Sequence, residues 1–315
     1  MEKLFDVLVV GELNVDLILN EIQKFPEVGK EVLAKTMTLT LGSSSAIFAS
    51  NISRLGASTT YIGKIGKDKF GQIVTDSLKK NKVDVSMIRI DKQLSTGATV
   101  VLNVEEDRAM ITFPGSMEHL TVNDITDTDL KRVRHLHFSS YFLQPGMGAN
   151  LGKLFRKAKD LGLTTSFDMQ WDPSEKWDLD VAGVLPFVDV FLPNEKELMC
   201  LTRRSSLIDA AHFLKPYTNI IAIKRGNKGS LVYSNGQLSE LPAFLNEKVV
   251  DAIGAGDSFN AGFIYKFING HDIIECQKFG NLAGAVSTTA SGGTAAFQDY
   301  QKFKLIAKEQ FGIHV

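Results

Sequence analysis

The stretch Val250-Asp-Ala-Ile-Gly-Ala-Gly-Asp-Ser-Phe-Asn-Ala-Gly262 places a turn of small residues directly before an expected helix that carries a carboxylate in its first turn. The backbone N–H groups of Gly254, Ala255 and Gly256 can approach an anion closely, because these residues have little or no side chain. Asp257 can accept a proton from an alcohol held beside a transferring phosphoryl group. The stretch predicts a site for phosphate chemistry, although taken alone it also fits a tight turn with a capping carboxylate.

Composition indicates an ordinary globular protein. The chain has 315 residues, of which 44% are hydrophobic and 23% charged, enough for one large α/β domain with a substantial core. Its 35 basic and 36 acidic residues form no long run of one sign, which argues against nucleic acid or an anionic membrane as a partner. Because the sequence has neither an apolar run of about 18 residues nor a basic leader segment, we expect a cytoplasmic protein.

Cysteine and histidine give no metal signal. Cys200 and Cys276 lie far apart without a Cys-x-x-Cys pattern, so neither a disulfide framework nor a zinc site is predicted, and both thiols are expected to be reduced and buried. His135 and His137 share one face of an expected strand, but two histidines without a third ligand are more often structural than metal-binding. We assign them no metal.

Strand-like and helix-like segments alternate along most of the chain. This alternation favours an α/β fold in which a doubly wound, mostly parallel sheet is flanked by helices. No linker or internal repeat divides the sequence, so residues 1–315 are predicted to form a single domain. The expected strands cover residues 5–11, 59–62, 135–138, 164–168, 188–192 and 220–224, and the expected helices cover 44–55, 71–80, 147–161, 194–201, 207–214 and 256–268.

Three segments interrupt the alternation and read as strands without helices. They cover about residues 16–20, 31–41 and 96–113, and the last reads as a hairpin around residues 105–107. Such segments can form a small second sheet over the carboxyl ends of the main strands, where ligands of α/β folds bind. We therefore expect a discontinuous β lid, whose exposed face is a candidate contact between two copies of the chain in a homodimer.

The turn after the first strand reads Gly11-Glu-Leu-Asn-Val-Asp16. It lacks the Gly-x-Gly-x-x-Gly spacing of a dinucleotide site, which disfavours a nicotinamide dehydrogenase. Asn14 and Asp16 stand two residues apart, hence on one face of an extended segment, where an amide and a carboxylate suit vicinal hydroxyls. A simple turn-forming role of both residues is the alternative.

These motifs together resemble the PfkB, or ribokinase-like, family of carbohydrate kinases, and the resemblance extends from Gly11 to Gly293. The opening stretch resembles the family's second signature, with Ala252 and Ile253 where the family tends to have Thr. The resemblance implies a ribokinase-like fold in which Asp257 is the general base. It also implies that the amides just before Asp257 stabilise charge on the γ-phosphoryl oxygens.

The segment 41–56 resembles the family's first signature, but Ser43 replaces a glycine and Ile47 replaces the usual asparagine. This second departure exchanges a polar contact with a sugar hydroxyl for an apolar wall. Asp172 stands where the family commonly has an arginine. By resemblance, the residues that bind the acceptor are Asn14, Asp16, Gly42, Ser43, Ile47, Arg108, Tyr141 and Gln170.

Asn194 and Glu197 resemble the family's Asn-x-x-Glu motif, which implies that Glu197 holds Mg²⁺ through water. A helix start with solvated charges is the alternative reading of the same pattern. The loop 224–229 stands where the family binds the phosphates and ribose of ATP, and a plain hairpin turn is its alternative. By resemblance, the nucleotide-binding residues are Asn194, Glu197, Lys224, Gly226, Gly229 and Asn281.

The resemblance implies an ATP-dependent kinase that phosphorylates a hydroxyl of a small sugar or polyol. Family members often bind a monovalent cation such as K⁺, for which Asp251 and the carbonyl of Ile253 are candidates. We predict an unphosphorylated acceptor, because a buried phosphate needs cationic partners that the expected acceptor pocket does not supply. A nucleoside or sugar-phosphate kinase of the same family and a non-catalytic sugar sensor are the alternatives.

Overall fold

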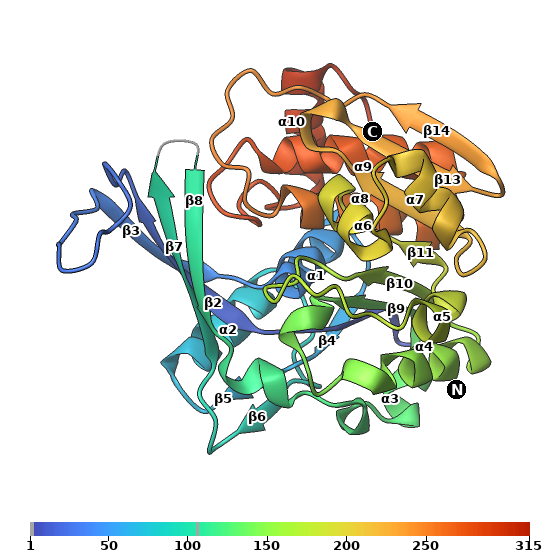
Figure 1. Ribbon diagram of the computed structural model, residues 1–315, viewed down its shortest axis with the longest axis horizontal. Coiled ribbons are helices and arrows are strands. Elements are labelled where there is room, and N and C mark those ends of the chain that lie inside the picture. The colour runs from blue at the N-terminus through green and yellow to red at the C-terminus, as the bar shows by residue number, and fades with distance from the viewer. Residues whose placement is uncertain (1–2, 105–106) are drawn as a thin grey trace.

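The structure is a computed structural model that describes residues 3–104 and 107–315, with the side chains of residues 107 and 108 outside the description. Figure 1 shows a large sheet covered by helices and a smaller sheet that stands apart at one side of it. The expected β hairpin turn at Glu105 and Glu106 lies outside the described residues.

The large sheet carries most of the described chain. Its strands are β1 (Phe5–Val10), β4 (Thr59–Ile62), β9 (Val133–Ser139), β10 (Thr164–Asp168), β11 (Val190–Phe191), β12 (Ile220–Lys224), β13 (Ser230–Ser234) and β14 (Gln237–Leu241). Their order is β14-β13-β12-β11-β10-β9-β1-β4. From β4 to β12 all neighbours are parallel, and β13 is antiparallel to both β12 and β14. The predicted doubly wound, mostly parallel sheet is confirmed.

Both faces of this sheet are buried by helices. Side chains alternate across β1, so that Val7 and Val9 face one apolar cluster while Leu8 and Val10 face the other. The first face is covered by α1, α2 and α8, and the second by α3 to α7. The helices are α1 (Ser44–Leu55), α2 (Lys69–Lys80), α3 (Asp127–Lys131), α4 (Leu151–Asp160), α5 (Val181–Val184), α6 (Glu195–Thr202), α7 (Leu207–Leu214), α8 (Ala255–Ile268), α9 (Ile273–Ser287) and α10 (Tyr300–Phe311).

Most predicted boundaries agree with the structure to within two residues, and the larger differences have local causes. The helix expected from residue 147 begins as α4 at Leu151, because Gly148–Asn150 forms a short 3-10 turn instead. The strand expected over 188–192 is only the two-residue β11, and Pro193 beyond it has no N–H with which to continue the ladder.

The small sheet consists of β2 (Asn14–Asn20), β3 (Thr36–Leu41), β7 (Gly97–Val104) and β8 (Asp107–Phe113), in the order β3-β2-β7-β8. It corresponds to the three predicted excursions from the main fold. The second excursion begins at Thr36 rather than at residue 31, because β2 ends at Asn20 opposite Thr36 and leaves residues 31–35 without a partner strand. A further pair of short strands, β5 (Lys64–Gly66) and β6 (Arg89–Asp91), completes the described sheets.

The remaining sequence predictions concern membranes, thiols and histidines. None of the described helices is both long and apolar enough to span a membrane. Cys276 is buried, whereas Cys200 is only partly buried, and both are free thiols. His135 and His137 are buried and share the hydroxyl of Ser166, which lies 2.7 Å from a ring nitrogen of each. Within residues 3–104 and 107–315, no group of three His, Cys, Asp or Glu side chains is arranged to hold a metal ion.

Candidate active site

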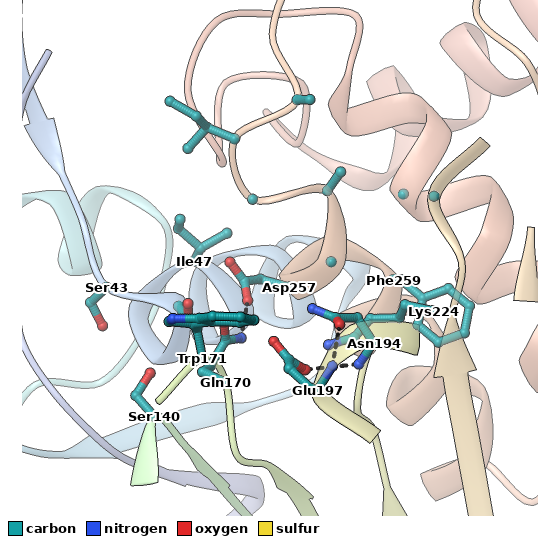
Figure 2. A pocket seen from close by; sticks show the side chains of 18 of the residues that line it. Ser43, Ile47, Ser140, Gln170, Trp171, Asn194, Glu197, Lys224, Asp257 and Phe259 are labelled. Atoms are coloured by element: carbon teal, nitrogen blue, oxygen red, sulfur yellow. Dashed lines mark hydrogen bonds between the residues drawn. The ribbon is translucent and has the colours of Figure 1, made fainter. Parts of the chain in front are cut away.

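One large cavity lies where the small sheet faces the carboxyl ends of the parallel strands. Its volume is about 1430 Å³, and its walls come from β2, β7 and β8 on one side and from the loops after β10, β11 and β12 on the other. The first turn of α8 also reaches it (Figure 2). This is the edge of a parallel sheet at which α/β proteins bind ligands.

The α8 N-terminus follows a tight turn that only small residues allow. Gly254 caps the helix in the left-handed region, at φ +73°, and a Cβ there would lie 2.7 Å from the Cα of Gly293. The helix begins at Ala255, one residue earlier than predicted. The N–H of Ala255 donates a long hydrogen bond of 3.3 Å to the carbonyl of Ala252. Gly254, Ala255 and Gly256 all line the cavity, as an anion-binding helix N-terminus requires.

Asp257 lies in the first turn of this helix, directly beside the glycine-rich turn. Its side chain is buried, and its Oδ1 accepts a hydrogen bond of 3.1 Å from Nε2 of Gln170. Burial and the negative charge of Asp168 raise the pKa of Asp257 to about 7, although the ammonium of Lys224 acts in the opposite direction. A carboxylate with this pKa is well matched to accept a proton near neutral pH.

Asp168, at the end of β10, is the centre of the charged network and was not identified from the sequence. It is fully buried, and its Oδ2 lies 2.7 Å from Nζ of Lys224. The same oxygen accepts hydrogen bonds from Gln170 at 2.9 Å and from Asn260 at 2.5 Å. Burial alone lowers the pKa of Lys224, but the carboxylates around it raise the pKa above its usual value. The sequence feature that could have identified Asp168 is its position as a carboxylate at the end of an apolar strand.

Asn194 and Glu197 form the start of α6 and also line the cavity. The side chain of Asn194 accepts a hydrogen bond of 2.9 Å from the Glu197 N–H, and Glu197 accepts one of 2.8 Å from the Asn194 N–H. This is a capping box, so the helix-start reading of the motif is correct. Glu197 is nevertheless buried rather than solvated, and burial together with the charge of Asp168 raises its pKa to about 7. Figure 2 shows Glu197, Asn194 and Lys224 close together.

The loop after β12 is a hairpin turn that forms part of the cavity wall. Gly229 has φ +88°, and a Cβ there would collide with the carbonyl of Leu241. Gly226 and Gly229 line the cavity, as does Asn281 of α9. The amide of Asn281 donates a hydrogen bond of 3.1 Å to the carbonyl of Pro242.

The predicted acceptor residues of β2 lie together on the opposite wall. Nδ2 of Asn14 donates to Oδ1 of Asp16 and to Oγ1 of Thr99, each at 3.0 Å. Burial raises the pKa of Asp16 to about 6. Gly42 contributes by having no side chain, since a Cβ there would collide with Asp16 Oδ1.

Ser43 and Ile47, the two departures from the first signature, both line the cavity. Ser43 has φ +70°, a conformation that favours glycine and costs a serine on the order of 1 kcal/mol. Its hydroxyl offsets this strain, because it donates to the Glu12 carbonyl at 2.7 Å and accepts from the N–H of Ala46 at 3.0 Å. The strain and the helix cap therefore occur at the same residue.

Glu12 also lines the cavity, and sequence reasoning missed it. It is nearly inaccessible to solvent, and its carboxylate is hydrogen-bonded by the Ser45 hydroxyl. Burial raises the pKa of Glu12. Its position directly after the first buried strand was the signal that could have identified it.

Of the predicted acceptor residues, Tyr141 lies outside the cavity and the side chain of Arg108 is not described. Ser140 adopts φ +60° and turns the chain, so that Ser140 and Phe142 line the cavity while Tyr141 packs against Phe142 and Phe167. Tyr141 lines a separate, smaller depression, because this turn directs its ring away from the acceptor wall. The side chain of Arg108 lies outside the described part of the chain.

Asp251 holds the loop before α8. Its carboxylate accepts hydrogen bonds from the N–H of Ile253 at 2.8 Å and from the N–H of Gly292 at 2.9 Å. Asp251 therefore joins the two loops beside the glycine-rich turn, and the predicted cation site at Asp251 and Ile253 stays a prediction.

A helix N-terminus that can receive an anion, a buried carboxylate next to it and a deep cavity at the end of a parallel sheet define a phosphotransferase-like α/β protein. The sequence profile of the pfkB family carbohydrate kinases matches residues 4–299, and the chain belongs to this family. It is a carbohydrate kinase.

Curated relatives are similar over most of the chain. An "Uncharacterized sugar kinase" of Archaeoglobus fulgidus is 29% identical over 74% of this chain and 92% of the relative. The "5-dehydro-2-deoxygluconokinase 1" of Bacillus cereus is 27% identical over 90% of this chain and 88% of the relative. Both are named as kinases.

Solved structures show the same fold. Arabidopsis thaliana ribokinase, described as complexed with ribose and ATP, superposes with a TM-score of 0.84 at 22% identity and covers 96% of this chain and 99% of its own. A putative ribokinase II of E. coli, described as in complex with ATP and Mg²⁺, has a TM-score of 0.84 at 24% identity and covers 98% and 100%. The predicted ribokinase-like fold is confirmed.

Proposed function

We propose that this kinase transfers the γ-phosphoryl group of ATP to a hydroxyl of a small, neutral sugar or polyol, with Asp257 as the general base. The observation that carries the proposal is the position of Asp257. It is buried in the first turn of α8, next to an anion-receiving turn and in hydrogen-bond contact with Gln170 of the loop after β10. Burial and the charge of Asp168 raise its pKa to about 7.

The reaction follows from this arrangement. Asp257 accepts the proton of the acceptor hydroxyl while the hydroxyl oxygen forms a bond to the γ-phosphorus of ATP. The bond between that phosphorus and the bridging oxygen breaks, and ADP leaves with the electron pair. Backbone N–H groups of the turn at Gly254, Ala255 and Gly256 donate to the γ-phosphoryl oxygens and stabilise the charge in the transition state. The α8 dipole acts in the same sense.

The nucleotide occupies the half of the cavity bounded by the loop after β12 and by α9. Gly226 and Gly229 leave space for its phosphates, Lys224 supplies a positive charge and Asn281 contacts the base. Glu197 would hold Mg²⁺ through a water molecule, and the bound Mg²⁺ would neutralise phosphate charge. Buried carboxylates at Asp168 and Glu197 support a cation here, since one lysine does not balance them. Asp251 and the Ile253 carbonyl are the proposed K⁺ ligands.

The small sheet is proposed to act as a lid. It forms one wall of the cavity through β2, β7 and β8, so a small rotation would close the acceptor away from water. Exposed apolar side chains that do not line the cavity, namely Met37, Leu39, Ile111 and Phe113, support a homodimer contact through this sheet.

The acceptor half of the cavity favours a neutral compound. Among the described residues that line the cavity, Lys224 and Arg225 are the only Lys or Arg side chains, and both lie after β12 on the nucleotide side. The acceptor wall instead presents Asn14, Asp16 and Gln170. Among the described residues of the acceptor wall, a carboxylate or phosphate on the acceptor would find no cationic partner, which is costly in a buried site. For this reason we do not assign to this chain the gluconate-derived acceptor that appears in the name of the Bacillus cereus relative.

An acceptor screen tests the proposal. ATP consumption is measured at fixed Mg²⁺ with free sugars, cyclitols, nucleosides, sugar acids and sugar phosphates, with Asp257→Asn as the matched control. The highest kcat/KM is expected for a neutral sugar or cyclitol. A clear preference for a phosphorylated acceptor, a sugar acid or a nucleoside would contradict the proposed acceptor class. Tight sugar binding without any ATP consumption would instead indicate the non-catalytic sensor.

A further inference from the structure

Trp171 is a large aromatic side chain that remains accessible inside the cavity. It is 43% exposed, although tryptophan is usually buried when nothing else requires its exposure. It follows Gln170, whose side chain contacts Asp257. Figure 2 shows the indole edge-on, with Ile47 and Asp257 on one side of the ring plane and Ser140 on the other. The flat face of the ring is therefore turned towards the space beside the base.

The segment that carries Trp171 has an unusual backbone. Gln170, Glu175 and Trp177 have φ values of +61°, +54° and +57°, a region that residues other than glycine rarely adopt. Each costs on the order of 1 kcal/mol and persists only where the surrounding structure enforces it. Three such residues within eight positions indicate a loop held in one shape.

Asp172 enforces this shape. Its carboxylate is buried and accepts hydrogen bonds from the N–H of Ser174 at 2.8 Å, from the Ser174 hydroxyl at 2.8 Å and from the N–H of Trp177 at 2.7 Å. Burial raises the pKa of Asp172, but these hydrogen bonds outweigh it and leave the pKa below its usual value. The acidic residue in place of the family's arginine thus serves the loop itself.

The loop in turn supports the indole of Trp171. Trp177 and Trp171 form an edge-to-face pair, with ring centroids 5.0 Å apart and planes at 89°. Phe142 also packs edge-to-face with Trp177, with ring centroids 5.7 Å apart and planes at 79°. Such edge-to-face pairs fix ring orientation and contribute beyond simple burial. These contacts hold the Trp171 ring in one orientation, and part of its surface stays accessible in the cavity.

We propose that the indole face of Trp171 is a stacking platform for the acceptor, which makes this kinase selective for ring-shaped neutral acceptors over open-chain ones. The inference rests on the proposed function and names its acceptor class more closely. Sugar and cyclitol rings present flat C–H faces that pack on an aromatic ring, while their hydroxyls point outward at the rim. Asn14, Asp16 and Gln170 provide polar partners for that rim, and Ile47 provides an aliphatic wall.

Intrinsic fluorescence tests binding without turnover, because the chain contains only two tryptophans. Trp177→Phe leaves Trp171 as the sole tryptophan, and Trp171→Phe is the matched control that leaves Trp177. Each variant is titrated without ATP with myo-inositol, D-glucose and D-fructose as ring probes and with D-mannitol and D-gluconate as open-chain probes. At least one ring probe is expected to shift the Trp171 emission and protect it from acrylamide, with a much smaller response in the control variant.

Kinetics test the same residue in an otherwise unchanged protein. Trp171→Ala is expected to raise the KM of the ring acceptor by about tenfold, equivalent to about 1.4 kcal/mol, while the KM for ATP changes little. Trp171→Phe, which keeps an aromatic face, should restore most of the loss. Circular dichroism and thermal unfolding of both variants show whether they fold.

The outcomes separate this inference from the proposed function. No Trp171 response to any ring probe, equal responses to open-chain probes, or an unchanged acceptor KM in Trp171→Ala would each overturn the platform. If a neutral acceptor is phosphorylated but its KM is unchanged in Trp171→Ala, the platform is wrong and the proposed function still holds. A ring probe that perturbs Trp171 but is never phosphorylated would support the platform and contradict the kinase reaction with that acceptor.

Discussion

The two halves of the cavity are built in different ways. The half around Asp257 is charged and tightly bonded: Asp168 and Glu197 are buried, Lys224 is mostly buried, and the three are bonded to one another or to the backbone. The acceptor wall carries no described Lys or Arg side chain and leaves Trp171 partly exposed. The comparison suggests that the reaction depends on a rigid set of buried charges, whereas selectivity depends on a few side chains that a substrate can reach.

The largest effect should come from removing the base at the junction of these halves. Asp257→Asn keeps the shape of the side chain but cannot accept the proton, so kcat should fall roughly 10²-fold to 10⁴-fold with little change in the KM for ATP. Steady-state kinetics measure both constants, with Glu309→Gln in the distant α10 as the control. Wild-type turnover in Asp257→Asn would show that Asp257 is not the general base, and the buried charges around it would then not explain the reaction.

The charged half should also be structurally fragile. Lys224→Met leaves the fully buried Asp168 without its cation and should lower the free energy of unfolding by about 3–5 kcal/mol, measured by denaturant titration. Lys228→Met is the matched control on the same loop, because Lys228 is exposed and pairs only at 3.7 Å with Glu195, so its loss should cost less than about 1 kcal/mol. Equal losses in the two variants would show that burial of this pair is unimportant.

A smaller effect is expected at the metal position. Glu197→Gln retains an oxygen for the capping box but removes a negative charge, so the Mg²⁺ concentration for half-maximal rate should rise roughly 10-fold to 100-fold. Glu195→Gln, two residues away on α6, is the control. If both variants share the wild-type Mg²⁺ dependence, Glu197 acts only as a helix cap.

The smallest effect tests the strained serine of the acceptor wall. Ser43→Gly relieves the φ of +70° but loses two hydrogen bonds, so the free energy of unfolding should change by about 1 kcal/mol or less. Ser43→Ala loses the same hydrogen bonds and keeps the strain, so it should be the less stable variant. Denaturant titration measures the free energy of unfolding of both variants. A more stable Ser43→Ala than Ser43→Gly would contradict this interpretation.

The sequence predicted features that depend on near neighbours. The turn at Gly254, the helix behind it and the Asn194–Glu197 pair all follow from residues within one or two helical turns. The segments of the small sheet were likewise visible, because alternating side chains mark a half-buried strand.

The features missed from sequence depend on long-range contacts. Asp168 pairs with Lys224 across 56 positions and with Asn260 across 92, which no local pattern reveals. Glu12 is recognisable as unusual only once its burial beside Ser45 is known. Tyr141 was predicted to line the acceptor pocket, but its neighbours Ser140 and Phe142 line it instead. The left-handed conformation of Ser140, which causes this difference, has no clear sequence signature.

The most direct measurement of the role of Asp257 is the pH dependence of kcat/KM for the acceptor, in the wild-type protein and in Asp257→Asn. The base must be ionised to accept a proton, and its pKa is raised to about 7, so the rise of kcat/KM with pH should be centred near pH 7 and level off above it. This rise should be absent from the residual activity of Asp257→Asn. A wild-type rise centred near pH 4, where an ordinary aspartate titrates, or the same rise in Asp257→Asn, would contradict the assignment.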